Sequence, residues 1–279
     1  MPNPFAGIAL HTWTLDTTPL PQALAAAREG GADAVELRQL DFKRGYAAGM
    51  TDAQIVDLVR ASGLPVSAVG VEYGWMFATG EESKRLFEVF RRQCENAVAL
   101  GCPLLMSATG QNDGRIADAI PRVREAGDIA AEFGLRLCLE FNSQHPTVNC
   151  IEAAREIVSG AGRRNVGLLL DAYHLHRSGR VGRAFADVPA EEIFYFQYSD
   201  VPAAPSAGAP RPTDRLPPGQ GVIDWPAVLG LLAEKNYTGY LSYEAPNPAH
   251  WARPPQDVVR EAVNATRKLI AQALAASGA

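Results

Sequence analysis

The chain has 279 residues, 47% of them apolar, and a formal net charge of −5 at pH 7. A sizeable core is therefore available, and the acidic balance argues against nucleic acid as the main partner, because binding to phosphates needs basic patches. No apolar run approaches the roughly 18 residues of a membrane span, and the N-terminal sequence MPNPFAGIALHTW lacks the basic and long apolar regions of a secretory signal. We expect no membrane partner and a cytoplasmic location.

The four cysteines, Cys94, Cys102, Cys138 and Cys150, form no CxxC pair, and Cys138 falls inside a predicted strand. Cysteines in such a pattern usually act as small apolar residues of a protein in a reducing compartment. Neither disulfides nor a cysteine zinc site is expected.

Strand-like apolar runs alternate with amphipathic stretches along the whole chain. The predicted strands are 7–11, 34–37, 66–71, 104–107, 135–141, 166–171, 193–198 and 240–245. The predicted helices are 21–29, 52–61, 81–100, 116–133, 151–158, 225–235 and 255–274, with a weakly marked one between 175 and 187.

Strict alternation of strands and helical connections predicts an α/β fold, a (β/α)₈ TIM barrel that forms a single domain over residues 1–279. A doubly wound open sheet is the alternative. That fold usually carries a glycine-rich phosphate loop after its first strand, where this chain has HTWT. No nicotinamide or flavin fingerprint, P-loop or nucleophile elbow is present, so no nucleotide cofactor is expected.

Four of the predicted strands end in an oxygen-bearing side chain. These are Glu140, Asp171, Gln197 and Glu244, which close the runs LRLCLE, VGLLLD, IFYFQ and YLSYE. The C-terminal ends of the strands of a barrel meet at one mouth, where barrel enzymes place their chemistry. Three carboxylates and an amide would offer hard oxygen ligands to one divalent ion, Mg²⁺ or Mn²⁺. For any one of these side chains alone, the alternative is a helix cap or a pair with an arginine.

The longest irregular stretch, 201–224, contains six prolines and three glycines. It follows the seventh predicted strand and so belongs to the catalytic face. A loop of this length in a compact domain is usually functional or disordered, which makes it a candidate lid.

The chain resembles the xylose-isomerase-like barrel superfamily, which includes sugar isomerases and epimerases, inosose dehydratase and 3-dehydroshikimate dehydratase. The likeness runs from HTWTL and AVELR through LEFN, LLLDAYH, FQYSD and RLPPGQGVIDW to GYLSYEA. In that family Glu, Asp, His and Glu hold a divalent metal, and the resemblance gives these places to Glu140, Asp171, Gln197 and Glu244. Gln197 is the departure, since many members have histidine there. Glutamine still supplies an oxygen ligand and is more typical of dehydratase-like members. The implied ion is Mn²⁺ or Mg²⁺, with Co²⁺ and Zn²⁺ left open.

The resemblance also implies residues near the substrate. His174, three residues after Asp171, matches a histidine near metal and substrate and is expected to be catalytic; a core histidine is the alternative. Arg215 matches a position that contacts anionic or hydroxylated substrate, with Arg211 as its rival.

Other strand ends supply further candidates. His11 and Trp13 form a candidate aromatic wall against a sugar ring, and Asn142 and His145 follow Glu140 closely enough to reach substrate. Three charged residues line the pocket or form a structural ion pair: Glu36, Arg38 and Glu72.

The predicted chemistry is proton abstraction next to a carbonyl of a small polyhydroxylated keto substrate. The metal would act as a Lewis acid, while Glu140 and Glu244 remove and return the proton. Return of the proton to another carbon or face makes the protein an isomerase or epimerase of a sugar or keto-sugar. Loss of a β-hydroxyl would make it a dehydratase (a lyase), the alternative that Gln197 and Arg215 favour.

Two other classes fit the fold less well. An endonuclease-like barrel shares the fold but expects several histidine ligands for a zinc cluster and a basic face, which five histidines in all and a negative net charge do not favour. A non-catalytic binding barrel would not need all four ligands. Barrels of this type often dimerise, which makes a homodimer the candidate assembly, although the sequence leaves the oligomeric state open.

Overall fold

The computed structural model describes residues 3–205 and 208–277. Eight strands follow one another in chain order, β1 to β8, around a closed barrel. This confirms the predicted (β/α)₈ barrel and excludes the open sheet. The residues group into two compact units, one of Met1–Glu36, Ser62–Pro65 and Asp171–Ala279 and one of Leu37–Ala61 and Val66–Leu170. Among the described residues, no helix is long and apolar enough to cross a membrane.

The first unit contains both ends of the barrel's strand order. Its elements are β1 (Gly7–His11), η1 (Thr12–Leu15), α1 (Leu20–Gly30), most of β2 (Ala34–Leu37), α7 (Ala172–Arg177), η2 (Ala190–Glu192), β7 (Ile193–Tyr198), α8 (Trp225–Glu234), β8 (Tyr240–Tyr243), α9 (Pro248–Trp251) and α10 (Pro255–Ser277). Strands β7, β8, β1 and β2 pair in parallel in that order.

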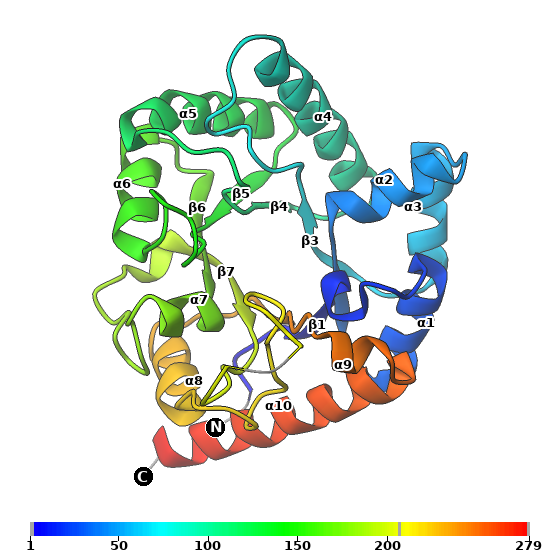
Figure 1. Ribbon diagram of the computed structural model, residues 1–279, viewed down its shortest axis with the longest axis vertical. Helices are drawn as coiled ribbons and strands as arrows, with labels where there is room; N and C mark the ends of the chain where they lie inside the picture. Colours follow the sequence, from blue (N-terminus) through cyan, green and yellow to red (C-terminus); the bar gives the residue numbers. More distant parts are fainter. Residues whose placement is uncertain (1–2, 206–207, 278–279) are drawn as a thin grey trace. The chain divides into compact units, whose positions relative to one another are not determined.

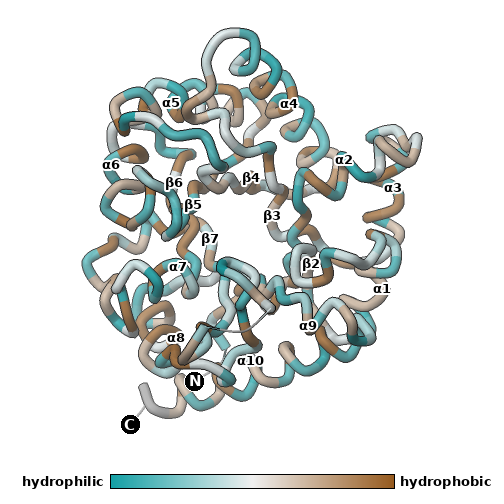
Figure 2. Tube along the Cα trace, viewed as in Figure 1, coloured by the Kyte–Doolittle hydropathy of each residue, from teal (hydrophilic) through white to brown (hydrophobic). Residues whose placement is uncertain are grey.

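Helix α10 packs beside α1 and α8, which are its neighbours in Figure 1. The approach to α1 depends on Gly30, because a Cβ at this position would collide with Val259 of α10. Helix α8 is apolar over most of its length and so appears mostly brown in Figure 2. Its leucines and its valine are buried. Burial of this apolar surface supplies the main stabilisation of the unit.

The second unit contains the middle of the strand order. Its elements are α2 (Gln39–Ala47), α3 (Asp52–Ala61), β3 (Val66–Gly70), α4 (Gly80–Ala99), β4 (Leu104–Ser107), α5 (Ile116–Glu132), β5 (Arg136–Glu140), α6 (Ile151–Ala161) and β6 (Val166–Asp171), the last residue of which belongs to the first unit. Strands β3 to β6 pair in parallel, and α5 lies between α4 and α6 (Figure 1).

All eight predicted strands are present, five with the predicted bounds and three, β3, β5 and β8, with ends that differ by one or two residues. The sequence did not predict α2, whose only buried residues are Asp41 and Phe42, so that it lacks a continuous apolar face. The weakly marked helix after the sixth strand begins earlier than expected, at Ala172, because the Asp171 side chain caps it directly.

Candidate active site

Strand register brings polar side chains of the first unit to the interior of the barrel. Gln197 of β7 pairs with Ser242 of β8, and Ser242 pairs with Ala9 of β1. His11, two residues after Ala9, pairs with Glu36 of β2. Paired residues of a parallel sheet share a face, and so do residues two apart on one strand. Gln197, His11 and Glu36 therefore face the same side as Glu244, which lies two residues beyond Ser242.

The end of β6 and the start of α7 supply the next group. Asp171 is fully buried, and its Oδ1 accepts a hydrogen bond from the Tyr173 amide at 2.9 Å. The Oδ2 atom lies 3.9 Å from His174 Nε2. Burial lowers the pKa of His174 to about 3, and the nearby Arg215 acts in the same direction, so the imidazole is neutral. A neutral imidazole can ligate a metal or accept a hydrogen bond.

Arg215 links the two carboxylates of this unit that the sequence assigned to a metal. Its Nη1 donates to Asp171 Oδ2 at 2.6 Å and to Glu244 Oε2 at 2.8 Å. Its Nη2 lies 3.2 Å from His174 Nε2, and its guanidinium carbon lies 4.4 Å from the centroid of the Tyr173 ring. Only 1% of the side chain is exposed, so the two ion pairs are shielded from water and salt. Arg211, the rival, is exposed.

Glu244 has a second neighbour in His11. His11 Nδ1 accepts from the Trp13 amide at 3.1 Å, which leaves Nε2 to carry the proton of a neutral ring. That Nε2 lies 3.4 Å from Glu244 Oε1 and 3.8 Å from Glu36 Oε1. His11 thus supports the carboxylates, whereas Trp13 is half-buried at the start of η1.

The side-chain amide of Gln197 forms a hydrogen bond through its nitrogen but not through its oxygen. Its Nε2 donates to Glu36 Oε1 at 2.8 Å, whereas its buried Oε1 has no hydrogen-bond partner among the described residues. Ser242 Oγ donates to the other Glu36 oxygen at 2.6 Å. Burial raises the pKa of Glu36 to about 8. An unsatisfied carbonyl oxygen in a dry interior is costly unless something binds it.

Glu140 ends β5 and is buried. In the ladder between β5 and β6 it pairs with Leu169, two residues before Asp171 on the same strand. Strand register therefore makes Glu140 and Asp171 neighbours on one face. Glu140, Asp171 and His174 form a buried group of side chains that could hold a metal ion. The sequence predicted the first two as ligands but gave His174 a catalytic role only.

The remaining sequence candidates have structural partners. Glu72 pairs with Arg85 of α4, a partner that the sequence did not predict, through two hydrogen bonds of 2.8 and 3.3 Å. Asn142 Oδ1 accepts from the Gln144 amide and so stabilises a turn. Contact of Glu72 or Asn142 with substrate stays a prediction.

His145 and Arg38 also have local partners. His145 Nδ1 accepts from the amides of Thr147 and Val148, so His145 anchors its own loop. Arg38 precedes α2, where its backbone amide donates to Asp41 Oδ2 at 2.8 Å and its guanidinium donates to Asp41 Oδ1 at 3.4 Å.

The loop after β7 is fastened at several points in the part that the structure describes; Ser206 and Ala207 lie outside the described residues. Asp200 accepts four hydrogen bonds of 2.8 to 3.0 Å. The donors are the amides of Val201, Gly219 and Ile223 and the indole of Trp225. Gly221 packs so closely that a Cβ there would collide with the Val201 carbonyl. The predicted lid is therefore anchored at both ends, and its closure over substrate stays a prediction.

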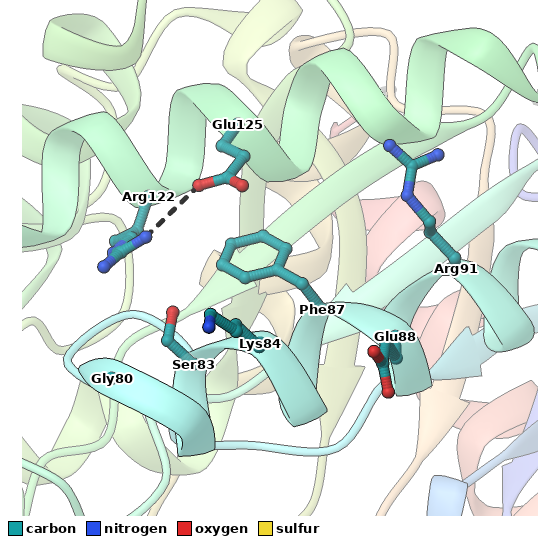
Figure 3. A pocket seen from close by; sticks show the side chains of 8 residues that line it. All are labelled: Gly80, Ser83, Lys84, Phe87, Glu88, Arg91, Arg122 and Glu125. Carbon is teal, nitrogen blue, oxygen red and sulfur yellow. Dashed lines mark hydrogen bonds and ion pairs between the residues drawn. The ribbon is translucent and has the colours of Figure 1, made fainter.

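A groove of about 500 Å³ lies elsewhere in the second unit, between α4 and α5 (Figure 3). Phe87 projects into it among charged side chains, and Arg122 pairs with Glu125 on one wall. Its residues come from helices and not from strand ends, so it offers none of the chemistry assembled around Asp171.

The xylose isomerase-like TIM barrel model matches residues 24–269, and the chain belongs to this family. An inosose isomerase of Bacillus velezensis is 26% identical over 270 residues, 93% of this chain and 95% of that protein. A 3-dehydroshikimate dehydratase of Pseudomonas aeruginosa is 30% identical over 191 residues, but these are only 29% of the dehydratase.

Solved structures share the fold. A crystal structure of IOLI protein with a bound zinc atom has a TM-score of 0.85 and 23% identity, with 95% of this chain and 98% of that chain covered. A D-allulose 3-epimerase of Methylomonas sp. has a TM-score of 0.73 and 17% identity, with 94% and 96% covered.

Proposed function

We propose that the protein is a divalent-metal-dependent isomerase of a cyclic keto-polyol of the inosose type. The observation that carries the metal is the set of buried donors. Glu140, Asp171 and His174 form one group able to hold an ion, and Gln197 Oε1 is buried with no hydrogen-bond partner among the described residues. Oxygen-rich sets with one imidazole suit Mn²⁺, Mg²⁺ and Co²⁺, and the zinc of the structural neighbour keeps Zn²⁺ among the candidates.

In this proposal Glu140, Asp171, Gln197 and Glu244 hold the ion, and His174 is a further candidate ligand. When bound, the metal would polarise the carbonyl of the substrate and make the neighbouring C–H more acidic. Glu140 and Glu244 are the groups that remove and return the proton. Arg215 and His11 keep the Glu244 carboxylate oriented, with Arg215 at 2.8 Å and His11 at 3.4 Å. Neutral His174 can form a hydrogen bond with a substrate hydroxyl without adding a charge to the site.

The substrate class rests on the relatives. Four inosose isomerases match 93% of this chain each, so the whole barrel is comparable. An inosose carries a ketone and adjacent hydroxyl groups on one ring. Its two neighbouring oxygens suit a site that combines a metal with several hydrogen-bonding side chains.

The test is a product assay by NMR with metal-stripped protein reloaded in turn with Mn²⁺, Co²⁺, Mg²⁺ or Zn²⁺. We expect interconversion of inosose isomers that requires metal and is lost in Glu140→Gln and Glu244→Gln. A protein that isomerises inososes after exhaustive chelation would contradict the metal, and one that is inactive with every metal would contradict the substrate class.

A second candidate is dehydration of a cyclic hydroxy-ketone acid such as 3-dehydroshikimate. It is favoured by Gln197, by the matching dehydratase segment and by Arg215 as a carboxylate partner. The same assay with 3-dehydroshikimate separates the two, because dehydration yields an aromatic product with distinct NMR signals.

A further inference from the structure

The amide of Gln197 can face the barrel interior in two ways, and only one presents an oxygen to a metal. An amide nitrogen is a donor and does not ligate a hard cation, whereas the amide oxygen does. In the structure the nitrogen is the atom that is engaged, with Glu36 Oε1 at 2.8 Å, and the oxygen is left without a hydrogen bond. The contact with Glu36 therefore determines which atom points away from it.

Glu36 reaches Gln197 because the strand between β2 and β8 carries a small residue at this level. Ala9 of β1 pairs with Ala34 on one side and with Ser242 on the other. Because Ala9 has only a methyl group, the Glu36 side chain can extend past β1 to Ser242 Oγ at 2.6 Å and to Gln197 Nε2 at 2.8 Å. Glu36, Gln197 and Ser242 are all 0% exposed, so water does not compete for these bonds.

The acceptor role of Glu36 Oε1 holds in both ionisation states of the carboxyl group. If the group is ionised, both oxygens accept. If it is protonated, the proton can sit on Oε2 beside Ser242 Oγ, and Oε1 still accepts from the amide. The carboxyl group thus favours one amide orientation whatever its charge.

We propose that Glu36 is a positioning residue that holds the Gln197 carbonyl oxygen toward the metal. The proposal rests on the proposed metal-dependent function and adds to it the reason why a glutamine can occupy a ligand place. Partners of this kind orient ligands in metal sites, and their removal typically costs about 10- to 100-fold in metal affinity.

The test is a double-mutant cycle in which Co²⁺ binding is followed by calorimetry and by the visible absorption of the bound ion. Glu36→Leu should lower affinity about 10- to 100-fold and shift the Co²⁺ spectrum in the same direction as Gln197→Ala. In the Gln197→Ala background, Glu36→Leu should cause no further loss. Glu36→Gln should restore affinity to within about threefold of the parent, because its side-chain oxygen can still accept from Gln197 Nε2.

Thr266→Val is the matched control. Thr266 is a buried polar residue of the same unit whose hydrogen bonds go to the Tyr198 hydroxyl and the Ala262 carbonyl, neither of which is a proposed ligand, so affinity should not change. If Glu36→Leu does not fold, as judged by circular dichroism, Glu36→Ala takes its place in the cycle.

An equal loss from Glu36→Leu in the presence and absence of Gln197 would overturn the inference, since Glu36 would then act through its charge. Unchanged affinity in Glu36→Leu or in Gln197→Ala would also overturn it, while leaving the metal-dependent function intact. A parent protein that binds no divalent ion would remove the function and the inference together.

Discussion

Asp171 and Glu244 could be predicted as site residues from the sequence, whereas their contacts with other residues could not. Both were predicted as ligands from their place at the ends of apolar strands, and both are buried inside the barrel. Their shared partner Arg215 was predicted only as a substrate contact. The pairing could not be read from the sequence, because it joins residues 44 and 29 positions apart through the geometry of a loop. The same holds for Glu36 and Gln197, which are 161 positions apart.

Gln197→His should preserve a metal site and shift its preference toward Zn²⁺ or Co²⁺. Imidazole is a softer ligand than an amide oxygen, and its second ring nitrogen can donate to Glu36 as the amide does. Competition titrations of both proteins with Mn²⁺, Co²⁺ and Zn²⁺ measure the ranking. An identical ranking would mean that residue 197 is not a ligand.

Arg215→Lys should reduce kcat/KM about 30- to 150-fold, equivalent to about 2–3 kcal/mol of transition-state stabilisation. Lysine keeps the charge but loses the planar group that spans Asp171, Glu244 and the Tyr173 ring. Steady-state kinetics on the isomerised substrate give the measurement. Arg211→Lys is the control, since Arg211 is exposed, and a larger loss there than at Arg215 would reverse the assignment.

The helices and loops differ in how well the sequence predicted them. The long helices have buried residues at helical spacing and were predicted almost to their ends, as α4 and α10 show. Helix α2 lacks such a face, and the loop after β7 has six prolines and three glycines and no helix or strand pattern. Its order comes from Asp200, a single buried carboxylate that gathers four donors. Neither proline content nor spacing predicts that convergence.

Asp200→Asn should destabilise the protein by about 2–4 kcal/mol and make the loop sensitive to protease. The amide NH₂ would face amide or indole N–H groups that now donate to a carboxylate oxygen, so buried donors lose their acceptor. Urea unfolding and limited trypsin digestion measure the two effects. Asp187→Asn, the same change at an exposed pair with Arg180, should stay within about 0.5 kcal/mol of the parent. Equal stability of both variants would contradict the anchoring role.

The barrel could be predicted because strand patterns and helix patterns alternate along the whole chain, as this fold requires. The burial of the cysteines agrees with their predicted role as small apolar residues. Cys94, Cys102 and Cys138 are buried, Cys150 is half-buried, and all four are thiols that form no disulfide among the described residues. Burial raises the pKa of Cys94 to about 12, so this thiol stays protonated in neutral solution.

A thiol reagent such as DTNB at pH 8 should therefore react readily with no more than one cysteine of the native protein, Cys150, and with all four in guanidinium chloride. Reaction requires the thiolate and access, and the three buried thiols lack access. Cys150→Ser should abolish the native signal. Rapid reaction of two or more thiols in the native protein would show that the packing around β4 and β5 is looser than described.

The central claim is that residues at the barrel mouth remove a proton next to a carbonyl in a metal-dependent way. Its most direct test is deuterium exchange at that carbon, followed by proton NMR of an inosose in D₂O with metal-loaded and chelated protein. Exchange reports the first step whether the substrate is later isomerised or dehydrated. We predict loss of the α-proton signal with the metal-loaded parent, and none with chelated protein or with the double variant Glu140→Gln/Glu244→Gln. Exchange that persists without metal, or turnover of substrate with no exchange, would contradict the account.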